Sequence, residues 1–300
     1  MLIQSPPQKH VSNEDRSVNF VWPVGNPNDM LEARFVRRTD DYFIVYVSSH
    51  SGCNQACRFC HLTATKQVGM SPAALDDLLT QADAVFGYYD QQIRTGSQPR
   101  AQRVNINWMA RGEPLLNDTL VVNGGKELLD ALAFRARSRR LLYQFNVSTI
   151  FPKDRPLDEV ESLFANPSVR LYYSLYSLDT TWRKRWIPKG HEPERVLDWL
   201  SAMQAKYGHE IAIHGAFIAN ENDSQQNVES IASAIASRQL NAKFNLVRYN
   251  PFSDAQGAES EESVLIARLD TLKTVTTENT RMVPRVGFDV KASCGMFMQP

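Results

Sequence analysis

The stretch Gly52-Cys53-Asn54-Gln55-Ala56-Cys57-Arg58-Phe59-Cys60-His61 holds three of the four cysteines in a chain of 300 residues. The cysteines follow the spacing C-x-x-x-C-x-x-C, so a single loop can direct three thiolates at one centre. Thiolates are the usual ligands of iron–sulfur clusters. Because a [4Fe–4S] cube has four irons to ligate, three local cysteines leave one iron open. The loop therefore indicates a cluster that is held by Cys53, Cys57 and Cys60 and has one reactive iron.

Two other uses of clustered cysteines fit this chain less well. A structural zinc ion takes four close ligands, and His61 directly follows Cys60, which is too near for the two to share a tetrahedral site comfortably. Disulfide frameworks are typical of short secreted chains that are rich in cysteine, whereas this chain is long and has four cysteines. The cluster is therefore the favoured interpretation.

Composition sets broad limits on the class of protein. Apolar residues make up 43% and charged residues 22% of the chain, an ordinary balance for a globular protein. Lys and Arg number 33, as do Asp and Glu, so any nucleic-acid footprint must be a local patch. No secretory signal is evident, and no apolar run approaches the ~18–20 residues of a membrane span. We therefore expect a cytoplasmic protein, a location that suits an oxygen-sensitive cluster.

Outside the cysteine loop, the hydrophobic pattern predicts alternating strands and helices. Residues 1–30 are polar and interrupted by prolines, and we expect an irregular lead-in segment there, followed by one domain over residues 31–300. Two β-rich runs, 31–36 and 42–47, flank a polar turn and predict a hairpin that leads into the loop. Further strands are expected at 104–109, 141–148, 169–175, 211–218, 243–247 and 281–286, and helices at 72–89, 115–137 with a break at 123–125, 156–164, 193–206, 224–238 and 260–276.

This alternation implies parallel βαβ units. About six units follow the loop, so we predict an α/β fold: a partial (β/α)6 barrel with an N-terminal β-hairpin extension. Functional loops then belong at the carboxyl ends of the barrel strands. Gly112 and Glu113 follow one strand, and Ser148, Ser174 and Asn250 lie at the ends of later ones. Taken singly, these residues also fit ordinary turns and helix caps.

Taken together, the motifs resemble the RlmN/Cfr group of radical SAM methyl synthases, which methylate an adenine carbon in ribosomal or transfer RNA. The resemblance covers roughly residues 31–298. The shared pieces occur in the family's order and approximate spacing, and they are Ser48-Ser49, the loop from Gly52 to Cys60, Gly112-Glu113-Pro114-Leu115-Leu116-Asn117, Ser148-Thr149, Ser174-Leu175, Asn250-Pro251-Phe252 and Cys294-Gly295. The loop alone would indicate only the superfamily, whereas the loop with the other motifs is much more specific.

The resemblance implies a cofactor set, a reaction and partners. The open iron of the [4Fe–4S] cluster binds S-adenosylmethionine (SAM), and the residues expected around these two groups are Phe59, Gly112, Glu113, Ser148, Ser174 and Asn250. Cys294 corresponds to an acceptor cysteine that takes a methyl group from one SAM. A 5′-deoxyadenosyl radical from a second SAM then abstracts hydrogen from that S-methyl group, and the methylene radical adds to adenine. The implied partners are an RNA substrate and a reductant such as flavodoxin or ferredoxin.

The chain departs from the family at one catalytic position. Tyr46 stands seven residues before Cys53, where the family has a second cysteine that helps to release the covalent RNA adduct. Tyrosine cannot form the disulfide that this release uses, and with an ordinary pKa near ~10 it is a poor base. Glu32 resembles a family glutamate near the start of the hairpin. Either another group releases the adduct, or the substrate or product differs. The alternative substrates are a nucleotide, DNA, a peptide or a metabolite. A third interpretation is a binding protein without turnover.

The region that grips RNA in better-known members also differs. Those members carry a helical accessory domain, and the residues that precede the hairpin here are too few for one. Two basic segments, 135–140 and 183–189, remain as candidate RNA contacts. Trp182 and Trp186 accompany the second segment and can stack on bases. Solvated helix ends are an equally good interpretation of both segments.

Overall fold

The strands of the protein form one sheet in which neighbours follow the order of the sequence. The structure is a computed structural model that describes residues 1–300. Strands β1 to β4 are antiparallel neighbours and β4 to β10 are parallel ones. The strands are β1 (Gln8–Val11), β2 (Val18–Pro23), β3 (Met30–Val36), β4 (Tyr42–Tyr46), β5 (Arg103–Trp108), β6 (Leu142–Thr149), β7 (Val169–Ser174), β8 (Ile211–Gly215), β9 (Ala242–Val247) and β10 (Arg281–Val283).

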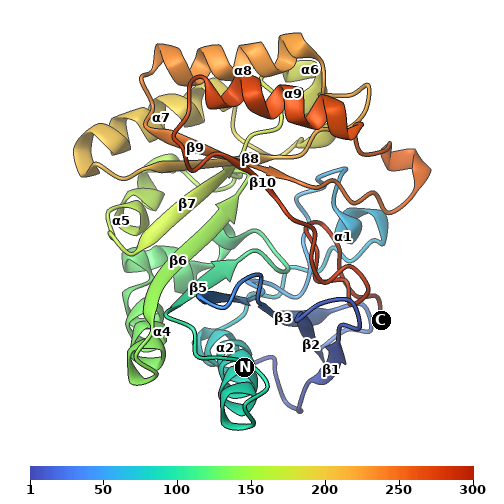
Figure 1. Cartoon of the computed structure of the whole chain (residues 1–300), viewed down its shortest axis with the longest axis vertical. Coiled ribbons are helices and arrows are strands. Elements are labelled where there is room, and N and C mark those ends of the chain that lie inside the picture. Colours follow the sequence, from blue (N-terminus) through green and yellow to red (C-terminus); the bar gives the residue numbers. More distant parts are fainter.

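Helices connect the parallel strands and cover the outside of the curved sheet (Figure 1). They are α1 (His61–Ala64), α2 (Leu75–Arg94), α3 (Asp118–Val121), α4 (Lys126–Ser138), α5 (Glu161–Phe164), α6 (Thr180–Trp186), α7 (Pro193–Tyr207), α8 (Gln225–Ser237) and α9 (Glu262–Lys273). Each strand from β4 to β9 is followed by at least one helix, which confirms the partial (β/α)6 barrel. None of these helices combines the length and the apolar character that crossing a membrane requires.

The predicted hairpin is present as β3 and β4, and its second strand is also the first strand of the barrel. β3 is buried along its whole length because both of its faces are covered. Leu31, Ala33 and Phe35 join the core beneath α2, whereas Glu32 and Arg34 face the C-terminal tail. The hairpin therefore links the barrel to the last residues of the chain.

The expectation of an irregular lead-in over residues 1–30 is wrong for the part that forms β1 and β2. These strands extend the sheet beyond β3. Val18, Phe20 and Trp22 alternate along β2 and reach the hydrophobic core. Asn19 points to the opposite face, where its amide donates to Glu32 Oε2 at 3.0 Å. Since this burial depends on a strand that comes later in the chain, local polarity concealed it.

The predicted break in the helix after β5 is confirmed at residues 123–125. Asn123, Gly124 and Gly125 have positive φ angles of 54°, 64° and 62°, which favour glycine. A Cβ atom on Gly125 would lie 2.4 Å from the carbonyl oxygen of Leu120. Only glycine therefore fits at position 125, and α4 begins directly after it.

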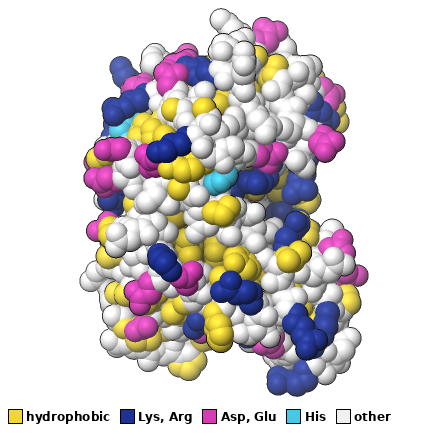
Figure 2. All heavy atoms as spheres, turned by 90° about the vertical axis from the view of Figure 1, so that its left-hand side faces the viewer, with side chains coloured by type: hydrophobic (Ala, Val, Ile, Leu, Met, Phe, Trp, Pro, Cys, Tyr) yellow, Lys and Arg dark blue, Asp and Glu magenta, His cyan; other side chains and the backbone are white.

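The surface carries charges of both signs. Figure 2 shows one face of the molecule, on which acidic and basic side chains are interspersed and hydrophobic side chains gather in the middle. No broad basic surface covers this face. Any strong positive field on this face must therefore come from local groups, as the zero net charge also implies.

Candidate active site

A cavity of about 260 Å³ lies inside the barrel and beneath the cysteine loop. Eleven of the twelve residues that the sequence indicates as site residues line it: Tyr46, Cys53, Cys57, Phe59, Cys60, Gly112, Glu113, Ser148, Ser174, Asn250 and Cys294. They come from loops and strands that are far apart in the chain. The parallel barrel brings them together because the carboxyl ends of its strands meet at one edge. Glu32 does not line the cavity.

The cysteine loop is fixed by its own backbone and by distant segments. The Cys53 amide donates to Gln67 O at 3.1 Å, and the Cys60 amide donates to Cys57 O at 3.1 Å. The His61 amide donates to the carbonyl oxygen of Gly295 at 3.1 Å, which ties the loop to the tail that carries Cys294. The loop is therefore held in place by contacts at both its ends.

Phe59 anchors the middle of the loop to a stack of aromatic rings. Its ring stacks on Tyr176 with centroids 4.4 Å apart, and the stack continues through Trp182 to Trp186. Trp182 and Trp186 are 5% and 1% exposed. The idea that these two tryptophans stack on RNA bases is therefore wrong, because their rings are already packed inside the protein.

The three loop cysteines are held in an environment that opposes thiolates unless a cation is present. Burial and the neighbouring Cys60 raise the pKa of Cys53 to about 12. Burial raises the pKa of Cys60 to about 11 and that of Cys57 well above its ordinary value. A bound metal supplies the positive charge that deprotonates such thiols outright. The donor set therefore fits an iron–sulfur cluster, which Cys53, Cys57 and Cys60 would hold.

The spacing of the cysteines bears on the zinc alternative. The thiols are near enough to raise one another's pKa values, yet no three His, Cys, Asp or Glu side chains converge closely enough to hold one metal ion. A cluster attaches each cysteine to a different iron atom and so needs its ligands farther apart than a single zinc ion does.

Gly112 and Glu113 are placed by the turn after β5. Gly112 has a φ of 95°, and a Cβ atom there would lie 2.4 Å from Ser49 Oγ and 2.8 Å from the backbone nitrogen of His50. Glu113 is buried, and its carboxylate accepts hydrogen bonds from the amides of Leu115 and Ile150, both at 3.2 Å. Burial nevertheless raises the pKa of Glu113 to about 7. The carboxylate therefore changes charge near neutral pH and favours a cationic ligand.

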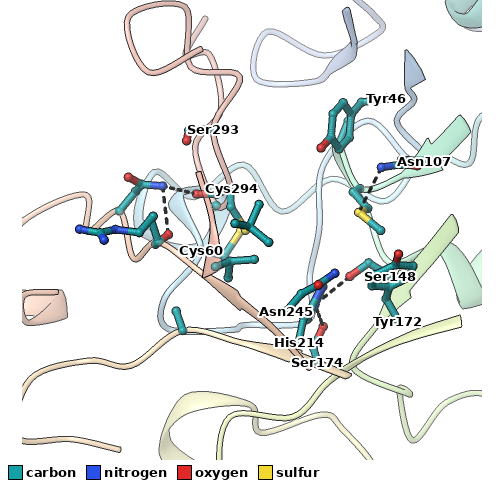
Figure 3. A pocket seen from close by; sticks show the side chains of 18 of the residues that line it. Tyr46, Cys60, Asn107, Ser148, Tyr172, Ser174, His214, Asn245, Ser293 and Cys294 are labelled. Carbon is teal, nitrogen blue, oxygen red and sulfur yellow. Dashed lines mark hydrogen bonds between the residues drawn. The ribbon is translucent and has the colours of Figure 1, made fainter. Parts of the chain in front are cut away.

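His214, at the end of β8, is a site residue that sequence reasoning missed. Its Nε2 atom lies 2.7 Å from Ser174 Oγ and 3.1 Å from Ser148 Oγ (Figure 3). Burial lowers the pKa of His214 to about 4, so the ring is neutral at pH 7. The histidine thus fixes the orientation of the two serine hydroxyls. A lone histidine at a strand end was the only signal in the sequence.

Cys294 lies beside Cys60 on one side of the cavity (Figure 3). Its side chain is open to the cavity, and the protein atoms around it raise its pKa. Asn250 holds its backbone, because the Asn250 amide donates to Cys294 O at 2.9 Å. The Asn250 side-chain oxygen is buried without a partner. The predicted acceptor cysteine and the predicted cluster cysteines therefore share one cavity.

Glu32 belongs to a buried ion network behind the cavity. Its carboxylate pairs with Arg111 Nε at 2.8 Å and with Arg34 Nη2 at 2.9 Å, and it accepts from the Met298 amide at 3.0 Å. Burial alone would raise the pKa of Glu32, but Arg111 and Arg34 hold it below the ordinary value. Arg34 and Arg111 also donate to Met296 O and Met298 O, both at 2.7 Å. The network therefore fastens the tail that carries Cys294.

Tyr46 faces the cavity from the side away from Cys294 (Figure 3). Its backbone pairs with Asn107 of β5, and its side chain lies near Arg38. Both basic segments are partly neutralised. In the first, Arg135 pairs with Asp83 and Arg139 with Asp90, and in the second, Arg185 pairs with Glu221. The arginines of the cavity are thus better placed than these segments to meet a ligand in the site.

The barrel and the cysteine loop at the end of its first strand define the radical SAM fold, and solved structures of that class superpose on this chain. No family model matches the chain. A radical SAM methyltransferase from Sphaerobacter thermophilus matches with a TM-score of 0.74 at 18% identity, over 97% of this chain and 80% of that one. This similarity confirms the partial barrel and its N-terminal hairpin.

SuiB from Streptococcus suis shares the fold over a smaller part of its length. Its structure bound to the precursor peptide SuiA matches with a TM-score of 0.54 at 12% identity, over 84% of this chain and 50% of SuiB. Its structure bound to S-adenosylmethionine matches with a TM-score of 0.53 at 12% identity, over 86% of this chain and 53% of SuiB. This chain therefore spans about half of SuiB.

Proposed function

We propose that this chain is a radical SAM enzyme that carries a methyl group on Cys294 and transfers its carbon to an adenine carbon in RNA. The observation that carries the proposal is the position of Cys294, which lies beside Cys60 in the cavity lined by all three loop cysteines. A cysteine for structural packing alone would not need to be open to this cavity. The order of the motifs from residue 31 to 298, which resembles the RlmN/Cfr group, supports the same reaction.

Each part of the site then has a role. When bound, the cluster and SAM, with an electron from a flavodoxin or ferredoxin, would supply a methyl group for Cys294 and a 5′-deoxyadenosyl radical that takes a hydrogen atom from it. Glu113 binds the ammonium group of SAM. Ser148 and Ser174, oriented by His214, offer hydroxyls to its ribose or carboxylate. Arg34, which donates to Met296 O, and Asn250, which donates to Cys294 O, hold the tail so that Cys294 stays at the cavity wall.

RNA is the proposed substrate because the resemblance implies it and because the cavity has cations to meet phosphate. Arg38 and Arg281 line the cavity, and neither makes a salt bridge in the protein. A peptide is the second candidate, since SuiB, which shares the fold, is bound to a precursor peptide. With Tyr46 in place of the second cysteine, adduct release must use another group.

Mass spectrometry of the tail tests the proposal directly. Protein expressed with an intact cluster should carry one additional methyl group on the peptide that contains Cys294, because the proposed reaction loads this thiol before substrate binds. The Cys57→Ala variant is the matched control, since it keeps Cys294 and removes a cluster ligand. A wild-type tail that is never methylated would contradict the methyl-carrier proposal.

The affinity for SAM should rise with pH through the pKa of Glu113, which burial places at about 7. Only the charged carboxylate attracts an ammonium group, so protonation below pH 7 weakens binding. Between pH 5.5 and 7.5 we expect the affinity to rise about tenfold, as measured by isothermal titration calorimetry on the anaerobic, reconstituted protein. The Glu113→Gln variant should bind weakly and show a flat profile. A wild-type affinity that does not change over this range would remove Glu113 from the SAM site.

A further inference from the structure

The interior of the barrel below the cysteine loop is lined by amide and phenol side chains. Asn107 of β5, Asn245 of β9, Tyr46 and Tyr172 line the cavity (Figure 3). Asn146 of β6 lines it as well. Closed (β/α)8 barrels fill this space with branched apolar side chains. A polar and hollow interior is costly unless a ligand satisfies it. The polar character of this part of the barrel therefore needs an explanation of its own, apart from the role of the cysteine loop.

Two of the three amides lack the hydrogen bonds that burial demands. Asn146 Nδ2 donates to Asn107 Oδ1 at 2.8 Å, but Asn146 Oδ1 is buried without a partner. The side chain of Asn245 makes no hydrogen bond, and its Oδ1 atom is buried. The two residues are only 5% and 9% exposed. Buried acceptors without a partner are uncommon in proteins, and a ligand that offers N–H donors would satisfy both oxygens.

The charge around these amides indicates the rest of the ligand. Arg38 and Arg281 line the same cavity, and Arg38 Nε is buried without a partner. Arg281 lies opposite Asn245 in the pairing of β10 with β9. The only carboxylate among the lining residues is Glu113, which is bonded to backbone amides. The interior therefore favours a ligand that is anionic as well as a donor of N–H groups.

We propose that Asn146 and Asn245 form a base-recognition subsite for the exocyclic amino group of a nucleotide, whose phosphate Arg38 and Arg281 bind. Tyr46 and Tyr172, which both line this cavity, would flank the planar base. Aromatic side chains commonly stack on unpaired bases in this way. The inference rests on the proposed function for the choice of a nucleic acid, and it adds the residues that select the base.

The chemistry of an amide explains why an amino base is selected. A side-chain amide that accepts from an amino group and donates to a ring nitrogen makes the paired contact that asparagine uses with adenine. The nitrogen of Asn146 is already committed to Asn107, so its oxygen serves only as an acceptor. A base without an amino group leaves that oxygen unpaired in the complex, which lowers affinity.

Equilibrium binding of matched RNA oligonucleotides tests the subsite without turnover. The probes are a fluorescent U4-A-U4 RNA and the same RNA with purine in place of adenine, so that hydrogen replaces the amino group. Anaerobic protein with its cluster and SAM, but without reductant, is titrated by fluorescence anisotropy. We expect the wild type to prefer adenine by about tenfold. Asn146→Ala and Asn245→Ala should each reduce this preference to twofold or less.

Two further variants separate base recognition from other effects. Asn279→Ala, at an exposed asparagine that donates to Glu210, should keep the full preference for adenine. Arg38→Gln should weaken both RNAs equally and reduce the salt dependence of binding, as expected for a phosphate contact. Cluster content and circular dichroism confirm that each variant is folded, and the two asparagine variants, on different strands, check one another.

Three outcomes would overturn the subsite: equal wild-type affinity for the two RNAs, no binding of either, or displacement of the RNA by an acidic peptide whose own binding weakens in Asn245→Ala. The methylation state of Cys294, measured on the same samples, tests the proposed function separately. A methylated Cys294 without base preference would overturn the subsite alone. A base preference with Cys294 never methylated would overturn the methyl carrier alone.

Discussion

Replacing Cys294 by serine is expected to lower methyl transfer on the order of 10³-fold or more, while cluster assembly and SAM cleavage persist. The thiol is the atom that would carry the methyl group, and a serine hydroxyl is a far weaker nucleophile at neutral pH. The backbone of Cys294 is held by Asn250, so this small change leaves the tail in place. Chromatography with mass detection measures 5′-deoxyadenosine and methylated RNA in one reaction.

The comparison with Cys57→Ala makes this result specific. Cys57 is buried in the loop and would ligate the cluster, so its loss should abolish both SAM cleavage and methyl transfer. A Cys294→Ser variant that still makes methylated product would show that the methyl group does not pass through the tail. A variant that loses its cluster would instead show that Cys294 is a ligand of the cluster itself.

The Glu32→Gln variant is expected to lose about 3–5 kcal/mol of unfolding free energy, the usual cost of removing one partner from a buried ion pair. Arg34 and Arg111 would remain buried without their carboxylate, since all three side chains are almost completely inaccessible to water. Because both arginines also bind the backbone of residues 296 and 298, the tail should loosen first. Denaturant unfolding measures the free energy, and hydrogen exchange over residues 292–298 measures the loosening.

A substitution that breaks an exposed ion pair provides the control for this loss of unfolding free energy. Asp130→Asn breaks the pair with Lys126 on the surface of α4, and it should leave both measurements unchanged. Glu32 has a lowered pKa, so the stability that it contributes is present above pH ~4.5 and is lost as the pH falls through its folded value. Hydrogen exchange in the tail that is equal in Glu32→Gln and wild type would contradict the proposed fastening role.

The barrel could be predicted from the sequence because each unit has a local signal. Apolar runs of strand length alternate with helical patterns after residue 31, and the break at Gly124-Gly125 is visible as two glycines. β2 could not be predicted in the same way. Its residue Asn19 reads as polar and exposed, yet it is buried because it meets Glu32 and the carbonyl of Val290. Burial that depends on partners so far along the chain has no local pattern.

The candidate site divides in the same way. The cysteine loop and the turn at Gly112 are motifs whose spacing can be read directly, and Cys294 is marked by the glycine that follows it. His214 and Asn245 are single polar residues in strands, and only the pairing of β7, β8 and β9 places them in one row. Glu32 was expected to act in catalysis, but its carboxylate is used by Arg34 and Arg111. Its part in the chemistry stays a prediction.

The ion network between Glu32 and the tail also has a consequence for how the protein matures. Met298 and Glu32 are joined although 266 positions separate them, and every strand of the barrel lies between them in the chain. Contacts between such distant segments are expected to form late, because closing the large loop between them costs chain entropy before the contacts stabilise the fold. Until the barrel is complete, Cys294 has no fixed place beside the cysteine loop. In the proposed function, the thiol that would carry the methyl group thus reaches the cysteine loop only in a finished fold, which works as an assembly checkpoint.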